Sequence, residues 1–429
     1  ESIERIIAMT GETPLYIYDR QLINERICTL RSILPAKIKL HYALKANPMP
    51  AVVHYLSGLV DGLDIASQGE MLTALNSGMH RSEISFAGPG KTDQELTAAI
   101  AAKIVINVES ARELERIDTL ARKLNLIPNI ALRINPDFEL KTSGMKMSGG
   151  PKPFGIDAEL IPAVLEKLEH LNMNFEGFHI FSGSQNLNHE AIIDAHNKTF
   201  ELAARLTRSV KIDFRFINIG GGFGIPYFPG DQPLKLQPVA DNLQLLLDTF
   251  SEFSDKQIVI ELGRYLVGEA GIYVSRIIDK KESRGTTYLV TDGGLHHHLS
   301  NSGNFGQLIR KNYPVIISNK IKAEKQEVVN IVGPLCTPLD VLANKMELPE
   351  ADIGDLVVIL QSGAYGKTAS PEKFLGHPAV KELYKVFRNF LSNFAVNKIS
   401  QTAQGFKYIG INIVVINDYF KVFFHRRYN

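Results

Sequence analysis

The sequence predicts a (β/α)₈ barrel followed by an antiparallel β domain. Eight short runs rich in Ile, Val and Phe are nearly continuous in apolar character, which is typical of strands buried on both faces. Helix-type stretches separate them, and this alternation favours parallel strands in a closed barrel. The predicted strands are residues 38–44, 62–66, 84–87, 104–108, 129–134, 175–181, 214–219 and 257–261.

The helix-type stretches also bear on the architecture. A doubly wound sheet is the competing fold, but polar residues follow most of the strand ends instead of meeting at one switch point, and this favours the barrel. The clearest predicted helices are residues 70–76, 93–101, 111–124, 160–171, 189–205 and 239–253.

After residue 261 the pattern changes to short strands joined by turns, which indicates an antiparallel β domain. The predicted strands of this domain are residues 272–278, 287–291, 327–332 and 355–360, together with 13–19 from before the barrel. The predicted domains are a barrel at 35–270, a β domain at 1–34 and 271–395, and an unassigned tail at 396–429.

Composition excludes several functional classes. The 429 residues are 45% hydrophobic and 22% charged with a net charge of +1, so nothing favours nucleic acid or an anionic membrane as a partner. The two cysteines, Cys28 and Cys336, do not make a disulfide framework, which suits a reducing compartment. We therefore expect a cytoplasmic protein that acts on small molecules.

A lysine, an acid and a glycine run follow three of the barrel strands. Lys45 comes just past the first strand, Glu261 ends the last, and Gly220, Gly221 and Gly222 follow the seventh. A desolvated lysine at such a position can form a Schiff base, and glycines let backbone N–H groups approach a phosphate. The run is no dinucleotide fingerprint, because Ile225 stands where a small residue is needed. The combination indicates pyridoxal phosphate.

The string YALKANP around Lys45 resembles the lysine motif of the fold-type III pyridoxal phosphate decarboxylases. This alanine-racemase-like barrel family includes diaminopimelate, ornithine and arginine decarboxylases. The resemblance covers residues 13–378 and implies a Lys45 Schiff base in a homodimer with shared active sites. It also implies that Glu261 of the string ELGR pairs with the pyridine nitrogen. An acid there keeps the ring protonated, which favours decarboxylation over racemisation.

The resemblance implies further contacts with the cofactor. Ser184, Arg264 and Tyr365 match phosphate-binding positions, together with the glycine run. Asp64 matches an acidic motif near the cofactor, as does Glu70, whereas Arg133 matches another barrel position. Glu70 and Arg133 could equally be scaffolding. The remaining predicted cofactor contacts are His179 and Phe181.

The string GPLC at residues 333–336 resembles a family motif whose cysteine reaches across the dimer interface into the partner's active site. It implies that Cys336 returns a proton to the substrate carbon after CO₂ leaves. A buried structural cysteine is the alternative reading. Thr337 and Asp340, which follow in the same segment, are the predicted substrate-binding residues.

Three departures narrow the substrate. Phe181 stands where common members have a stacking histidine, and Thr337 stands where they have an acid for a distal ammonium. Residues 299–314 lack the arginine motif that holds the distal carboxylate of diaminopimelate. The strings FHIFSGSQNLN, DGGLHHH and FLGHP instead resemble glutamyl-carrier-protein decarboxylases and the exosortase-associated decarboxylase group.

The leading hypothesis is a pyridoxal-phosphate-dependent amino-acid α-decarboxylase that releases CO₂ from a carrier-bound glutamyl substrate. A diaminopimelate decarboxylase that makes L-lysine and a non-catalytic cofactor-binding protein are the alternatives. No metal is expected, because the three consecutive histidines from His296 to His298 cannot all point one way.

Overall fold

The computed structural model describes residues 3–138, 145–146, 149–209, 213–228, 230–305, 310–321 and 323–385. The chain forms two compact units, which are described separately. One comprises Asn24–Pro226 and Asp231–Gly268, and the other comprises Glu1–Ile23, Tyr227–Gly230 and Glu269–Asn429. Residues 24–34 thus fold with the barrel strands. The predicted tail at 396–429 lies outside the described residues.

The first unit is a closed barrel of eight parallel strands, as the sequence predicts. Strand β12 pairs with β2, and β5 pairs with β6, so the ring has no free edge. A two-residue strand that was not predicted, β8 (Ile156–Asp157), pairs with the end of β6. The barrel strands are β2 (Ile38–Ala43), β3 (Gly62–Ile65), β4 (Ile84–Phe86), β5 (Val105–Val108), β6 (Asn129–Asn135), β9 (Asn174–His179), β11 (Phe216–Gly221) and β12 (Gln257–Leu262).

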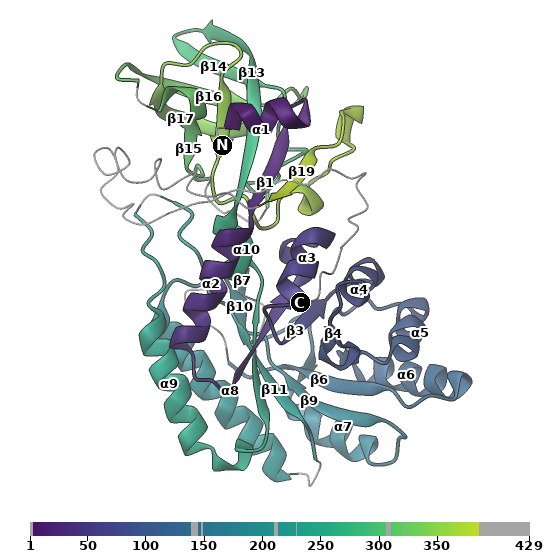
Figure 1. Ribbon diagram of the computed structural model, residues 1–429. Coiled ribbons are helices and arrows are strands. Elements are labelled where there is room, and N and C mark those ends of the chain that lie inside the picture. The colour runs from purple at the N-terminus through teal and green to yellow at the C-terminus, as the bar shows by residue number, and fades with distance from the viewer. Residues whose placement is uncertain are drawn as a thin grey trace, which may run out of the picture. The chain divides into compact units, whose positions relative to one another are not determined.

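Helices surround the strands of this unit (Figure 1). Their starts follow local capping chemistry: the Thr92 hydroxyl and the Glu95 side chain form a capping box, and Ser67 accepts a hydrogen bond from the Glu70 backbone N–H. The helices are α2 (Arg20–Ile33), α3 (Pro50–Ser57), α4 (Gln68–Leu75), α5 (Asp93–Ala102), α6 (Ala111–Leu124), α7 (Ile161–Leu168), α8 (His189–Ser209), α9 (Leu236–Thr249) and α10 (Arg264–Val267).

The second unit is the predicted β domain, a mostly antiparallel sheet that also contains two parallel pairs. Most neighbours are antiparallel, but β1 pairs with β19 and β14 pairs with β16 in parallel. Each parallel pair joins segments that are distant in sequence, so a tight turn does not set its direction. The strands are β1 (Leu15–Asp19), β13 (Gly271–Ser283), β14 (Thr286–Thr291), β15 (Val315–Ile317), β16 (Gln326–Val332), β17 (Val341–Pro349), β18 (Leu356–Ile359) and β19 (Lys381–Lys385).

One α-helix and three strands of this unit were not predicted. Helix α1 (Ile3–Thr10) buries Ile3, Ile6 and Ile7 along one face. Strands β15, β17 and β19 were not predicted either. In β17, exposed polar residues interrupt the apolar pattern. None of the helices in the described ranges has both the length and the apolar character needed to cross a membrane.

Candidate active site

The polar side chains that follow apolar ones along the barrel strands are called the polar layer. Side chains two residues apart on a strand point to the same face of the sheet. The residue two positions after each apolar residue therefore points to the same face as that residue. The apolar layer contains Val105, Ala131, Phe216 and Val259. Two positions further along these strands are Asn107, Arg133, Asn218 and Glu261. His179 of β9 joins this layer, because it is in register with Arg133 and with Asn218.

Four polar side chains form a hydrogen-bonded chain across the neighbouring strands β2, β3, β4 and β5. His41 Nδ1 lies 3.3 Å from Asp64 Oδ1, and the Ser85 hydroxyl donates to the same oxygen over 2.5 Å. Asn107 Nδ2 donates to Ser85 Oγ over 3.1 Å. Burial would lower the pKa of His41, but the carboxylates of Asp64, Glu83 and Glu261 together outweigh it and raise that pKa.

On the adjacent strand β12, Glu261 is the register partner of His41 and is held between two cationic or donor groups. His179 Nε2 lies 3.1 Å from Oε2, and Lys45 Nζ lies 3.8 Å from Oε1. The Glu261 side chain is only 5% exposed. Burial alone would raise the pKa of Glu261, but the His179 hydrogen bond and the nearby charges of Lys45 and Arg133 lower it to about 2. The carboxylate therefore stays ionised.

Lys45 lies in a short 3-10 turn, η1 (Leu44–Ala46), directly after β2. Its side chain is 43% exposed, so the amine can reach a ligand above the barrel. Lys45 Nζ is 5.2 Å from the centre of the Phe181 ring. The phenyl ring and the amine thus face one another beside the buried carboxylate.

The glycine run ends β11 where the backbones are too close for side chains. A Cβ at Gly221 would lie 2.2 Å from the Glu261 carbonyl oxygen, and one at Gly220 would lie 2.9 Å from the Ile180 oxygen. Gly222 has a φ of +76° and accepts a hydrogen bond from the Asn186 N–H. These contacts hold the segment that carries Ser184 against the glycine run.

The comparisons with known proteins agree with this arrangement. Residues 20–268 match the family described as "Pyridoxal-dependent decarboxylase, pyridoxal binding domain". The chain belongs to the pyridoxal-dependent decarboxylase family. It is 37% identical over 383 residues to the L-glutamyl-(BtrI acyl-carrier protein) decarboxylase of Niallia circulans, covering 87% of this chain and 89% of that protein.

Diaminopimelate decarboxylases are also similar to this chain. The protein from Aquifex aeolicus is 35% identical over 363 residues, which is 84% of each chain. The crystal structure of diaminopimelate decarboxylase from Helicobacter pylori complexed with L-lysine superposes with a TM-score of 0.79 at 28% identity, covering 89% of this chain and 93% of that chain. The chain is thus a carboxy-lyase of the pyridoxal-dependent type, with the barrel and mixed sheet of its relatives.

The barrel residues fit pyridoxal phosphate. A reachable amine at Lys45, an ionised acid at Glu261 and an aromatic face at Phe181 supply the chemistry that this cofactor requires. Asp64 Oδ2 is buried and has no hydrogen-bond partner in the described part of the chain.

The remaining predicted site residues belong to different parts of the chain. Arg264 begins α10 after Gly263, within the barrel unit. Tyr365 belongs to the mixed-sheet unit, where its carbonyl accepts from the Ser300 hydroxyl over 2.6 Å. Cys336 is exposed on the connection between β16 and β17, which argues against a buried structural cysteine. Thr337 follows it and is half-buried.

Asp340 is enclosed by backbone. Its carboxylate accepts hydrogen bonds from the N–H groups of Leu295, over 2.6 Å, and Leu335, over 2.8 Å. A Cβ at Gly294 or Gly333 would lie 2.3 Å from one of its oxygens. Burial raises the pKa of this carboxyl group. In this structure Asp340 closes the Cys336 loop, and its predicted contact with substrate stays a prediction.

The three consecutive histidines are packed inside the mixed-sheet unit. His297 Nε2 lies 2.8 Å from the Pro378 oxygen, and His298 Nε2 lies 2.8 Å from Ser362 Oγ. Burial lowers the pKa of His296 to about 3 and that of His298 to about 3. The described residues contain no cluster of three side chains able to hold a metal ion.

Several residues of the polar layer were missed by sequence analysis. His41, Ser85 and Asn107 are polar residues inside apolar strands, and that interruption is the signal that could have found them. Arg133 forms an ion pair of 2.8 Å with Glu109. Glu70 accepts the Ala66 N–H over 2.7 Å, which supports the scaffolding alternative for that residue.

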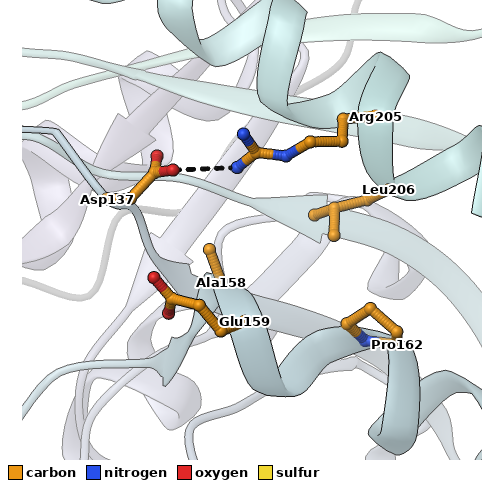
Figure 2. A pocket seen from close by; sticks show the side chains of 6 residues that line it. All are labelled: Asp137, Ala158, Glu159, Pro162, Arg205 and Leu206. Carbon is orange, nitrogen blue, oxygen red and sulfur yellow. Dashed lines mark hydrogen bonds and ion pairs between the residues drawn. The ribbon is translucent and has the colours of Figure 1, made fainter.

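A second depression lies away from these residues. Arg205 Nη2 and Asp137 Oδ2 form an ion pair of 3.0 Å across a surface pocket of about 290 Å³ (Figure 2). Ala158, Glu159 and Pro162 line it from the turn before α7 and the start of that helix, and Leu206 lines it from α8. It contains none of the predicted site residues.

Proposed function

We propose that this decarboxylase removes the α-carboxylate of a glutamyl group carried on an acyl carrier protein. The observation that carries the proposal is the ionised Glu261, which is held by His179 beside the amine of Lys45. Pyridoxal phosphate, when bound, supplies the sink for the electron pair that departing CO₂ leaves behind. An anion at the ring nitrogen favours that reaction over racemisation.

The residues have distinct proposed roles. Lys45 holds the cofactor through its amine, and Glu261 keeps a proton on the ring nitrogen. Phe181 covers a face of the ring by dispersion, without a titrating group. The phosphate is held by the glycine run and by Ser184, Arg264 and Tyr365. Asp64 and His179 complete the cofactor contacts.

Cys336 has the proposed role of returning a proton to the substrate carbon. Its exposure supports a role in which the thiol serves the active site of a second subunit of a homodimer. Cys28 and Cys336 are both free thiols, which supports the further proposal of a cytoplasmic location.

The substrate proposal depends on charge. Thr337 follows Cys336 where an acid would hold a distal ammonium, and an unpaired ammonium in a desolvated site is costly. An acyl group on a carrier has no such ammonium. The similarity to the L-glutamyl carrier-protein decarboxylase supports the same choice.

Diaminopimelate decarboxylation is the second candidate, favoured by the 35% identity to the Aquifex aeolicus enzyme. The non-catalytic alternative is not retained, because the chain matches named decarboxylases over most of its length.

The deciding experiment measures CO₂ release from meso-diaminopimelate, lysine, ornithine, free glutamate and a glutamyl carrier protein, with Lys45→Ala as the control. We expect release from the carrier thioester alone. Release from diaminopimelate would replace the substrate proposal with the second candidate. Full activity of Lys45→Ala would overturn the role of that lysine.

A further inference from the structure

His179 reaches Glu261 across an intervening strand. The order of strands is β9, β11, β12, so the two side chains come from strands that are not neighbours. Asn218 of β11 is the register partner of His179 on one side and of Val259 on the other. The hydrogen bond of 3.1 Å between the His179 and Glu261 side chains therefore spans the width of β11.

The glycines of β11 make this crossing possible. The register shifts between Asn218 and Gly221, and Gly221 then lies opposite Glu261. A Cβ at Gly220 would meet the Ile180 oxygen, and a Cβ at Gly221 would meet the Glu261 oxygen. Glycine at both positions therefore lets the backbones of β9, β11 and β12 approach one another closely beside the imidazole and the carboxylate.

The two oxygens of Glu261 have different surroundings. Oε2 faces His179 Nε2, whereas Oε1 faces Lys45 Nζ at 3.8 Å. Two other charged or titratable groups lie around Glu261. Arg133 comes from β6, and His41 on β2 is the register partner of Glu261. In the part of the chain that is described, His179 Nδ1 is buried and has no hydrogen-bond partner.

We propose that His179 is a positioning residue that fixes the orientation and the charge of Glu261 by donating its Nε2–H to Oε2. Oε1 would then be the oxygen left to accept a hydrogen bond from a protonated ring nitrogen of the cofactor. This inference rests on the proposed function of Glu261 and adds a second residue on which that function depends. Once the Lys45 amine is bonded to the cofactor, His179 is the remaining hydrogen-bond donor to the carboxylate among the groups named above.

The test compares His179→Gln with His179→Leu. Glutamine can place an N–H donor near the position of Nε2, whereas leucine has similar bulk and no donor. The absorption spectrum of the bound cofactor is titrated with pH in each holoenzyme without substrate, and kcat and KM are measured separately. Loss of a hydrogen bond to a charged group shifts the protonation equilibrium of that group by about 10- to 100-fold.

In His179→Leu we expect the midpoint pH of the spectral transition at acidic pH to rise by about one to two units. We also expect kcat to fall by about 10- to 100-fold with little change in KM. His179→Gln should stay near the wild type in both. A folded His179→Leu protein with the wild-type titration would overturn the proposal. So would a His179→Gln protein as impaired as His179→Leu, because only a packing role would then remain.

The proposed reaction and the proposed role of His179 can be refuted separately. A wild-type protein that releases CO₂ from none of the tested substrates would overturn the proposed reaction. The spectral titration would still decide whether His179 controls Glu261, because it needs the cofactor but no turnover.

Discussion

Replacing Glu261 by glutamine removes the negative charge on which the decarboxylation chemistry depends. The carboxylate is 5% exposed and yet ionised, because His179 and Lys45 outweigh the cost of burial. Glutamine keeps the size but cannot hold a proton on a ring nitrogen. The lost charge-assisted hydrogen bond corresponds to about 1.5–3 kcal/mol, which is about 10- to 150-fold in rate.

The assay is CO₂ release under saturating substrate, with cofactor content checked by absorbance. We expect kcat of Glu261→Gln to fall by at least about 10-fold while KM changes little, because the carboxylate acts on the ring nitrogen, where it keeps the proton that lets the ring accept electrons, and not on the substrate. Glu83→Gln is the matched control. Glu83 is half-buried and paired with Arg215 over 2.9 Å, just before β4 begins and so at the opposite end of the strands. A Glu261→Gln enzyme that keeps more than half of the wild-type kcat would refute the role of the carboxylate.

Three further predictions concern shared sites, buried charge and pH. Inactive Lys45→Ala and Cys336→Ala subunits, mixed and allowed to exchange, should recover about a quarter of the wild-type activity if each site uses both chains of a homodimer; no recovery after verified exchange would exclude shared sites. Lys91→Met should destabilise the protein by about 3–5 kcal/mol in urea unfolding, because the buried ammonium is paired over 2.8 Å with a buried carboxylate. The exposed control Lys167→Met should change the free energy of unfolding by under about 1 kcal/mol. Equal destabilisation by Lys91→Met and Lys167→Met would contradict this account. Because the folded pKa of Glu261 is lowered to about 2, its contribution to the stability of the cofactor-free protein is present above the unfolded value near 4.5 and lost as pH falls toward 2; an unfolding free energy with the same slope over this range in Glu261→Gln would disprove it.

The barrel could be predicted because its strands are buried on both faces. Such strands have continuous apolar runs, and all eight predicted runs overlap the observed strands. The mixed sheet was harder. Strand β17 contains Asn344, Lys345 and Glu347 among its apolar residues, and its pairing with β16 includes register shifts. Local pattern cannot reveal a strand whose outer face is solvated and irregular.

Part of the candidate site could likewise be predicted from the sequence, and part could not. Lys45 and Glu261 follow strand ends, so their positions alone place them at one end of the barrel. The partner of Glu261 could not be predicted, because His179 lies 82 residues away and on a strand that is not its neighbour. That pairing depends on the closure of the barrel and on the bulge in β11.

The sequence by itself determined the closed barrel, the use of pyridoxal phosphate and the residues at the strand ends, because these depend on local apolar pattern and short motifs. Only the tertiary structure decided how the polar layer is connected. The chain from His41 through Asp64 and Ser85, and the separate contact of His179 with Glu261, both depend on register between strands. Register depends on side-chain packing and ring closure throughout the barrel, and a linear pattern does not record it.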